Sequence, residues 1–242
     1  DDLITAEAQK LEALKAHKKS LMQQLFPREG ETKPRLRFPE FRDAGDWDEK
    51  PLGKVATFHS GGTPSKSNPE YWEGSTPWIS ASSMHEITIG KSDAHITEKA
   101  VEDGAQIAAK GTLLLLVRGS MLHKRIPMGI AATEVTYNQD VKALSLKKNV
   151  AAEFLLYLLM AAEWDLLNAV TKTGIGAGKL DSSDLNSLPI KIPSPLEQQK
   201  ITDCLIPLND LITAQAQKLE ALKAHKKGLM QQLFPTSDEV SG

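Results

Sequence analysis

The segment Asp1–Pro27, DDLITAEAQKLEALKAHKKSLMQQLFP, occurs a second time as Asn209–Pro235, NDLITAQAQKLEALKAHKKGLMQQLFP. The two copies differ only at Asp1/Asn209, Glu7/Gln215 and Ser20/Gly228. They should therefore fold alike and present the same surface. A repeated segment on either side of an unrelated sequence predicts a globular unit with a matching element at each end.

Both copies have the pattern of an amphipathic helix. Apolar residues at helical spacing form a narrow stripe in the first copy, which consists of Ile4, Leu11, Leu14, Leu21 and Leu25. A stripe this narrow is typical of a coiled-coil seam, so each helix is expected to pack on another helix. Because the copies are nearly identical, they can pair antiparallel about a local two-fold axis.

The second helix should be the longer one. Ser194–Glu197 reads as a capping box with Pro195 in the first turn, and the helical pattern runs on into the repeat. Pro207 inside it predicts a kink or a short break, because proline lacks a backbone donor. The expected division is a first helix at 1–27, a long helix at 194–235 and a disordered tail at 236–242.

Residues 28–193 have a different character, with frequent Gly and Pro and short apolar runs, and they predict a compact domain. One helix is expected at Ala151–Val170. The candidate strands are Val55–His59, Trp78–Ser80, Leu113–Val117, Gly129–Ala132, Val141–Leu146 and Leu188–Ile192. The expected fold class is α+β, a globular domain flanked by long amphipathic helices that pack as an antiparallel coiled coil.

The charge is near neutral overall but unevenly distributed. The 242 residues carry a net charge of -2, and 40% of them are hydrophobic, as in an ordinary globular protein. Lys110–Lys148 contains seven Lys or Arg against two acids, whereas Glu40–Asp103 contains twelve acids against six bases. A locally positive face is therefore compatible with the average charge.

Several classes of protein are disfavoured by composition. The single cysteine, Cys204, cannot form an internal disulfide, and no Cys/His spacing suggests a zinc site, so a cytoplasmic protein without a metal is expected. No uncharged run approaches the roughly 20 residues of a membrane span. The sequence starts at Asp1 without an initiator Met, which suggests a fragment or a trimmed chain.

No enzyme signature is complete. Residues 173–180, TGIGAGKL, resemble a phosphate-binding loop, but Thr173 replaces its first Gly and Leu180 replaces its Ser or Thr. The Asx-Pro-Pro-aromatic tetrapeptide of amino-methyltransferases, which act on a flipped base, is absent from the sequence. A chain without a catalytic site or a cofactor of its own is expected.

A set of separated blocks resembles the Type I restriction-modification DNA specificity (S) subunits. The blocks are Trp47 with Leu52–Val55, Gly61–Ser65, Tyr71–Trp72, Pro77–Ile79, Arg118–Ser120, Asn138–Asp140, Gly178–Leu180, Leu188–Ile190, Ile192–Pro193 and Glu197–Ile201, leading into the repeated helix. Each block alone is weak, but their order over nearly the whole chain is specific.

The resemblance implies a target recognition domain that reads one half of a bipartite site in double-stranded DNA, between helices that fix the distance to the other half. It also implies methyltransferase (M) and restriction (R) subunits as partners, with S-adenosylmethionine, ATP and magnesium bound by those partners. This sequence departs from the family pattern in having one recognition domain. Either it is half of a longer chain, or it dimerises through its helices.

The candidate DNA-binding residues are Ser65, Lys66, Arg118, Ser120, Lys124, Arg125, Lys172 and Lys179. The run RGSMLHKR follows an apolar strand and should form a loop at its end, where basic side chains can grip phosphates. The Gly-rich segments Gly61–Lys66 and Thr171–Lys179 allow close backbone approach, although they can equally be structural turns. Asn138 and Gln139 could read adenine, but a capped turn explains them equally well.

Two alternatives remain open on sequence grounds. A protein-interaction scaffold would use the paired helices as its working surface and would bind DNA weakly and without salt dependence. An enzyme with an unrecognised site is disfavoured, because no cluster of titratable residues has convincing spacing.

Overall fold

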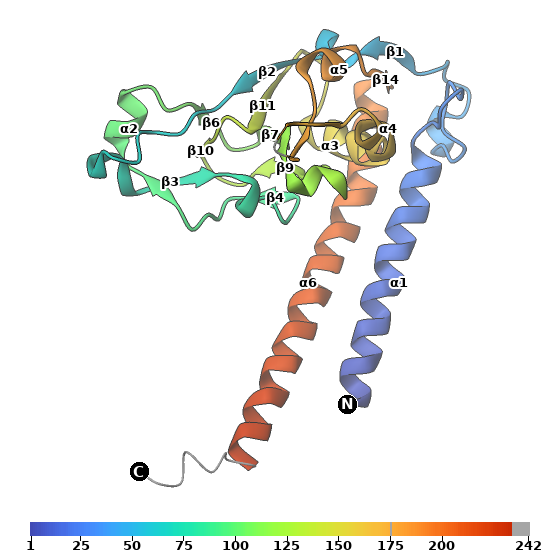
Figure 1. Cartoon of the computed structure of the whole chain (residues 1–242). Coiled ribbons are helices and arrows are strands. Elements are labelled where there is room, and N and C mark those ends of the chain that lie inside the picture. The colour runs from blue at the N-terminus through green and yellow to red at the C-terminus, as the bar shows by residue number, and fades with distance from the viewer. Residues whose placement is uncertain (175, 234–242) are drawn as a thin grey trace, which may run out of the picture.

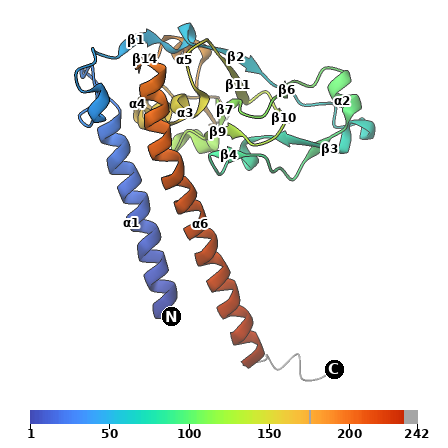
Figure 2. The ribbon, with the colours of Figure 1, turned by 180° about the vertical axis from the view of Figure 1, so that it is seen from behind.

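The computed structural model describes residues 1–174 and 176–233, and shows a globular domain at one end of two long helices (Figure 1). Helix α1 (Asp2–Leu25) and helix α6 (Pro195–Leu233) lie side by side and run in opposite directions, as both views show (Figures 1 and 2). The expected antiparallel pair is confirmed. The tail predicted at 236–242 lies outside the described residues.

Helix α6 continues through Pro207 without the short break that the sequence suggested. Proline removes one backbone donor, but packing on both sides holds the helix together. Ile201 and Leu205 are buried against the globular domain before Pro207, while Gln215 and Leu219 are buried against α1 after it.

The core of the domain is a five-stranded sheet of order β2-β11-β7-β9-β4. Its strands are β2 (Ala56–Ser60), β11 (Val141–Leu146), β7 (Leu113–Leu116), β9 (Met128–Ala131) and β4 (Thr88–Ile89). All pairs are antiparallel except β4 with β9. The four leucines of β7 are fully buried, as a continuous apolar run predicts for a central strand.

A second sheet has the order β5-β3-β10-β6 and carries the part of the domain farthest from the helix pair (Figure 1). Its strands are β5 (His95–Ile96), β3 (Trp72–Ile79), β10 (Val135–Tyr137) and β6 (Ile107–Ala108). The short helix α2 (Glu98–Glu102) follows β5, and α2 contacts the 3-10 helix η3 (Pro69–Tyr71).

Two small sheets complete the domain. Strand β1 (Asp48–Pro51) pairs with β14 (Pro189–Ile192), and strands β12 (Thr171–Lys172), β13 (Gly178–Lys179) and β8 (Arg118–Gly119) form a three-stranded sheet in that order. The short helices between the strands are α5 (Ser182–Ser187) and the 3-10 helices η1 (Pro39–Phe41), η2 (Leu52–Lys54), η4 (Ala81–Ser83) and η5 (Ser120–His123).

The single helix expected at 151–170 is two helices, α3 (Ala152–Ala161) and α4 (Glu163–Asn168). The chain departs from helical geometry at Ala162, and the Glu163 carboxylate there accepts a hydrogen bond from the Ile126 amide at 2.8 Å. Helix α3 is apolar all round, because it packs between the central sheet and the helix pair.

The end of α1 is inserted into the domain at a site that we call the helix seat. Phe26 packs between Trp47 and Phe154, with ring centroids 6.3 and 5.8 Å away. Met22 and Leu25 are also buried in this cluster, with 8% and 1% of their surface exposed. The helix seat thus fixes α1 to the globular domain.

The equivalent residues of the second copy lie at the free end of α6 and are exposed. Met230 and Leu233, which correspond to Met22 and Leu25, are 48% and 69% exposed. The same sequence is therefore buried at one end of the helix pair and uncovered at the other.

Candidate nucleic-acid interface

Three of the predicted basic residues lie together on the β12-β13-β8 sheet. Arg118 of β8 stands directly opposite Lys179 of β13, and Lys172 of β12 stands opposite Gly178. Like charges that face each other across strands destabilise a sheet. The Asp181 carboxylate pairs with Lys179 and partly offsets this repulsion, whereas Arg118 and Lys172 are exposed.

A tight turn joins this sheet to η5. Gly119 has φ of 150°, a conformation that side-chain-bearing residues rarely adopt, and it turns the chain directly into the 3-10 helix. His123 at the end of η5 contacts the Gly176 carbonyl oxygen through Nε2 at 2.9 Å. This contact, which the sequence did not predict, ties η5 to the turn that connects β12 and β13.

The other residues of the RGSMLHKR run have different surroundings. Ser120 and Lys124 are exposed at the two ends of η5, next to the three-stranded sheet. Arg125 turns inward, and its guanidinium Nη2 donates to the Met84 carbonyl oxygen at 3.1 Å. Arg125 thus holds a neighbouring loop, while Ser120 and Lys124 remain available to a ligand.

Ser65 and Lys66 lie in a separate loop that two tryptophans hold in place. Trp72 Nε1 donates to the Ser65 carbonyl oxygen at 3.1 Å, and Trp78 Nε1 donates to the Gly62 carbonyl oxygen at 3.0 Å. The Ser65 carbonyl also closes a turn with the Asn68 amide, so Lys66 is exposed in the middle of that turn. The loop is therefore held by hydrogen bonds from within the domain.

The structure brings the predicted residues into two groups. The loop of Lys66 leads into η3, which packs on α2 at the end of the domain far from the helix pair (Figure 1). The three-stranded sheet follows α4, which lies beside the helix pair. A ligand that touches both groups must extend across the domain.

The remaining glycine and amide candidates have structural explanations. A side chain at Gly61 would collide with the Tyr137 carbonyl oxygen, so this glycine permits a close backbone approach within the domain. Asn138 is buried, and its Oδ1 accepts from the Asp140 amide at 3.0 Å in a capped turn. Gln139 is exposed and accepts from the Thr63 hydroxyl at 2.8 Å.

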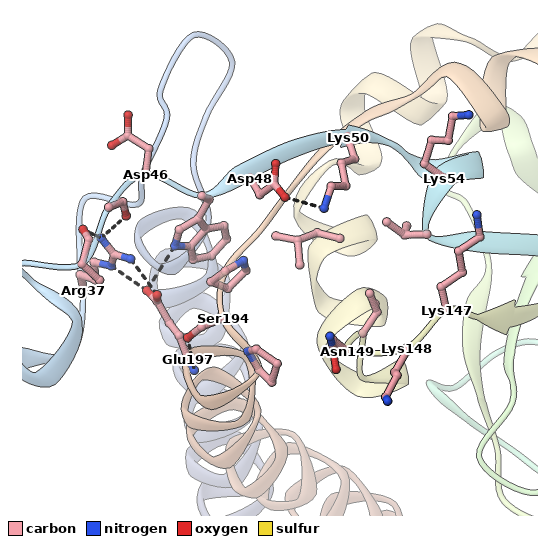
Figure 3. Close-up of a pocket in the computed structure, with 18 residues that line it drawn as sticks. Arg37, Asp46, Asp48, Lys50, Lys54, Lys147, Lys148, Asn149, Ser194 and Glu197 are labelled. Carbon is pink, nitrogen blue, oxygen red and sulfur yellow. Dashed lines mark hydrogen bonds and ion pairs between the residues drawn. The ribbon is translucent and has the colours of Figure 1, made fainter.

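A further basic group that the sequence did not single out borders an open hollow of about 700 Å³ between the domain and the start of α6. Lys50, Lys54, Lys147 and Lys148 lie along one side of it, opposite Arg37 and Glu197 (Figure 3). Lys147 and Lys148 directly follow β11, so a Lys-Lys pair after a central strand was the signal that could have indicated them.

The wall opposite these lysines is a buried ion pair. Arg37 Nε and Nη2 donate to the two Glu197 carboxylate oxygens at 2.7 and 2.8 Å, and Trp47 Nε1 donates to Glu197 Oε1 at 3.2 Å (Figure 3). The carboxylate raises the pKa of Arg37 above its usual value. Arg37 also donates to the carbonyl oxygens of Ala44 and Gly45, so the first turn of α6 is anchored to residues 37–47.

In the described part of the chain no helix is long and apolar enough to cross a membrane, and no group of three His, Cys, Asp or Glu is placed to hold a metal ion.

Curated relatives of this chain are specificity subunits of Type I restriction enzymes. The EcoR124I/EcoR124II specificity subunit of Escherichia coli is 34% identical over 66% of this chain and 40% of its own length. The MjaIX specificity subunit of Methanocaldococcus jannaschii is 33% identical over 74% of this chain and 41% of its own length. The chain thus spans about 40% of the length of these relatives.

Solved structures show the same fold. The HsdS subunit from Thermoanaerobacter tengcongensis matches with a TM-score of 0.63 and 19% identity, over 96% of this chain and 52% of that one. The S subunit of a Type I restriction-modification system from M. genitalium matches with a TM-score of 0.63 and 16% identity, over 98% of this chain and 58% of that one. The family model described as "Type I restriction modification DNA specificity domain" matches residues 44–224, so this chain belongs to that family.

Proposed function

We propose that this chain reads one half of a bipartite target in double-stranded DNA, as the specificity component of a Type I restriction-modification system. The observation that carries the proposal is the β12-β13-β8 sheet, where Arg118 and Lys179 face each other across paired strands and Lys172 lies on the neighbouring strand. Asp181 offsets only part of the repulsion between Arg118 and Lys179, and a phosphate backbone would compensate the rest.

Ordered turns supply the contacts in this proposal. Arg118 and Lys179 would contact phosphates from one face of the three-stranded sheet, with Ser120 and Lys124 beside it. Lys172 stands opposite Gly178, so its side chain leaves the sheet on the other face and would contact the duplex separately. Ser65 and Lys66 form a second ordered contact at the far end of the domain, and Arg125 supports the interface from inside. Base-edge contacts would then choose the sequence, because phosphate contacts position a protein without reading bases.

The test is the salt dependence of DNA binding. Arg118→Ala and Lys124→Ala should each weaken binding and reduce the slope of log K against log salt by about 0.9, the value for one phosphate contact. Lys223→Ala is the matched control, since Lys223 is an exposed base on α6 far from the sheet. Slopes that stay equal in all three variants would remove Arg118 and Lys124 from the interface.

The exposed end of α6 supports a second recognition domain at the far end of the helix pair. Met230 and Leu233 are uncovered there, although their counterparts Met22 and Leu25 fill the helix seat. A second domain with an empty seat would cover them. The other arrangement is a homodimer that pairs through the helices. In such a dimer the helix seat of each copy is already filled by its own α1, so the exposed end of α6 would stay uncovered. Light scattering would show whether the chain dimerises.

The chemistry of the complex would belong to other subunits. We propose that methyltransferase and restriction subunits dock on this chain in the cytoplasm and carry S-adenosylmethionine, ATP and magnesium, while this chain catalyses no reaction. Copurification with the methyltransferase subunit and mapping of methylated adenines would identify the target. Methyl transfer or DNA cleavage by the purified chain alone would contradict the non-catalytic role. Weak DNA binding that does not depend on salt would instead favour a role as a protein-interaction scaffold.

A further inference from the structure

The positions at which the two repeat copies differ can be located on the α1–α6 interface. The contact between Lys18 Nζ and Asn209 Oδ1 measures 2.8 Å, and Lys226 pairs with the Asp1 carboxylate. Positions 18 and 226 are equivalent in the repeat, as are positions 1 and 209. The two contacts are therefore the same contact, repeated by a local two-fold axis across the helix pair.

A residue close to such an axis meets its own counterpart. Glu7 and Gln215 are equivalent positions, and they touch each other. Gln215 Nε2 donates to Glu7 Oε2 at 2.5 Å and to the Glu7 carbonyl oxygen at 3.1 Å. The contact is buried, since 9% of Glu7 and 4% of Gln215 are exposed, and Lys218 also pairs with the Glu7 carboxylate.

Pairing of like copies would change this contact. Two first-copy helices would bring two Glu7 carboxylates together. Lys10, the equivalent of Lys218, would lie beside each of them, but the two carboxylates would meet with like charge and no amide donor between them. Two second-copy helices would bring two glutamines together and leave both copies of Lys218 without the carboxylate. Pairing of unlike copies is the only arrangement in which the carboxylate receives both the amide and the ammonium group.

The other two differences do not discriminate between the pairings. At position 1 both Asp and Asn offer an oxygen to the lysine opposite, so like and unlike pairs are both satisfied. Ser20 accepts from Gln24 within its own helix at 3.2 Å, and Gly228 has no side chain to contribute. Only position 7 lies where the choice of partner matters.

We propose that the Glu7–Gln215 contact makes the first-copy helix select a second-copy helix and reject a second copy of itself. The near-identical helices would otherwise offer the same surface to every neighbour, and pairs of like helices between molecules would compete with the native pair. A single buried polar contact is sufficient for this, since such contacts fix partner and register in coiled coils.

The test uses disulfide cross-linking of the full chain. Ala8 is half-buried beside Glu7, so Ala8→Cys places a thiol near the axis, where two first-copy helices would bring two such thiols together. Cys204 is the one natural cysteine of the chain, and Cys204→Ser removes it, so the native pair offers the new thiol no disulfide partner. Under mild oxidation this parent chain should form cross-linked dimers slowly.

Adding Glu7→Gln to the parent should raise the rate of cross-linking by about tenfold or more, because like and unlike pairs then become equivalent. Glu12→Gln, an exposed site on the same helix with the same charge change, should leave the rate low. The exchange variant, which combines Glu7→Gln with Gln215→Glu, keeps the wild-type composition. Its carboxylate stands at position 215, where Lys10, the equivalent of Lys218, is placed by symmetry to pair with it. The low rate of cross-linking should therefore be restored.

Gln215→Glu gives a second, independent test. It puts two carboxylates into every pairing, so unlike pairs lose their advantage over like pairs, and the rate of cross-linking should again rise. The proposal is overturned if Glu7→Gln and Gln215→Glu both leave the rate at the parent level. It is also overturned if the exchange variant cross-links as fast as Glu7→Gln, or if Glu12→Gln accelerates the reaction equally. Helical circular dichroism of each variant verifies that the chains compared are folded.

Discussion

The Arg37–Glu197 ion pair is a buried anchor between the globular domain and α6. Both side chains are almost fully buried, the carboxylate receives two guanidinium bonds, and Trp47 adds a third donor. Removing one partner of a buried pair is costly, because the other charge is left without compensation.

Glu197→Gln should therefore lower the free energy of unfolding by about 3 kcal/mol or more. Chemical denaturation followed by circular dichroism would measure the change. Glu220→Gln, an exposed site on the same helix, should alter stability by less than about 1 kcal/mol. A small effect at Glu197 would mean that the apolar contacts of Ile201 and Leu205, and not the ion pair, fix α6 to the domain.

Individual side-chain roles were the hardest feature to predict from sequence. The basic run at 118–125 follows a buried strand as expected, but it forms strand β8 and the 3-10 helix η5 where a loop was predicted. The inward turn of Arg125 depends on Met84, which lies 41 residues away. The contact of His123 with Gly176 and the pairing of Arg118 with Lys179 are likewise long-range. Residue spacing carries no information on such contacts, and the DNA-binding role of each residue stays a prediction.

The helix pair also has a titratable group at its centre. Hydrogen bonds from Lys218 and then Gln215 hold the pKa of Glu7 below its usual value of 4.5, and Lys10 adds to the effect. A lowered folded-state pKa means that the unfolded chain binds the proton more readily. The stability that Glu7 contributes is thus present above about pH 4.5 and is lost as the pH falls through the lowered value.

Glu7→Gln should therefore flatten part of the acid dependence of stability. Urea unfolding at neutral pH and at a pH below 4 should show a smaller loss for the variant than for the parent. The loss should not vanish, because the pKa values of Glu31 and Glu40 are also lowered in the folded chain. Equal losses in both chains would show that the carboxylate contributes nothing to the helix pair.

Elements with strong local patterns were predicted well. The repeat gave both long helices, and all six expected strands overlap observed ones, with β11 matching Val141–Leu146 in full. The two-residue strands β4, β5, β6, β8, β12 and β13 were missed, as were β1 and β10, because strands this short are defined by partners elsewhere in the chain. The division into α3 and α4 depends on Glu163 bonding to Ile126, which periodicity does not reveal.

The length of the helix pair is expected to set the distance between the two halves of the DNA target. Insertion of the same seven residues after Lys15 of α1 and after Ile212 of α6 would keep the contacts of Glu7, Lys18 and Asp1 in register. It would lengthen the pair by about 10 Å, or about three base pairs of duplex.

Mapping of methylated adenines in cells that carry the lengthened chain should show half-sites of unchanged sequence with a spacing about three base pairs larger. The addition of seven residues after Gly242 is the length-matched control and should leave the spacing unchanged. A changed half-site sequence would contradict the assignment of sequence choice to the globular domain alone.

The double attachment of the globular domain has a consequence for the DNA itself. Phe26 anchors the domain to α1 and Glu197 anchors it to α6, so the angle between domain and helices has little freedom. A duplex whose relaxed path does not match that angle must curve to meet the protein, and the energy of curvature depends on base pairs that no side chain touches. Flexible pyrimidine–purine steps between the half-sites should then tighten binding, and stiff A-tracts should weaken it.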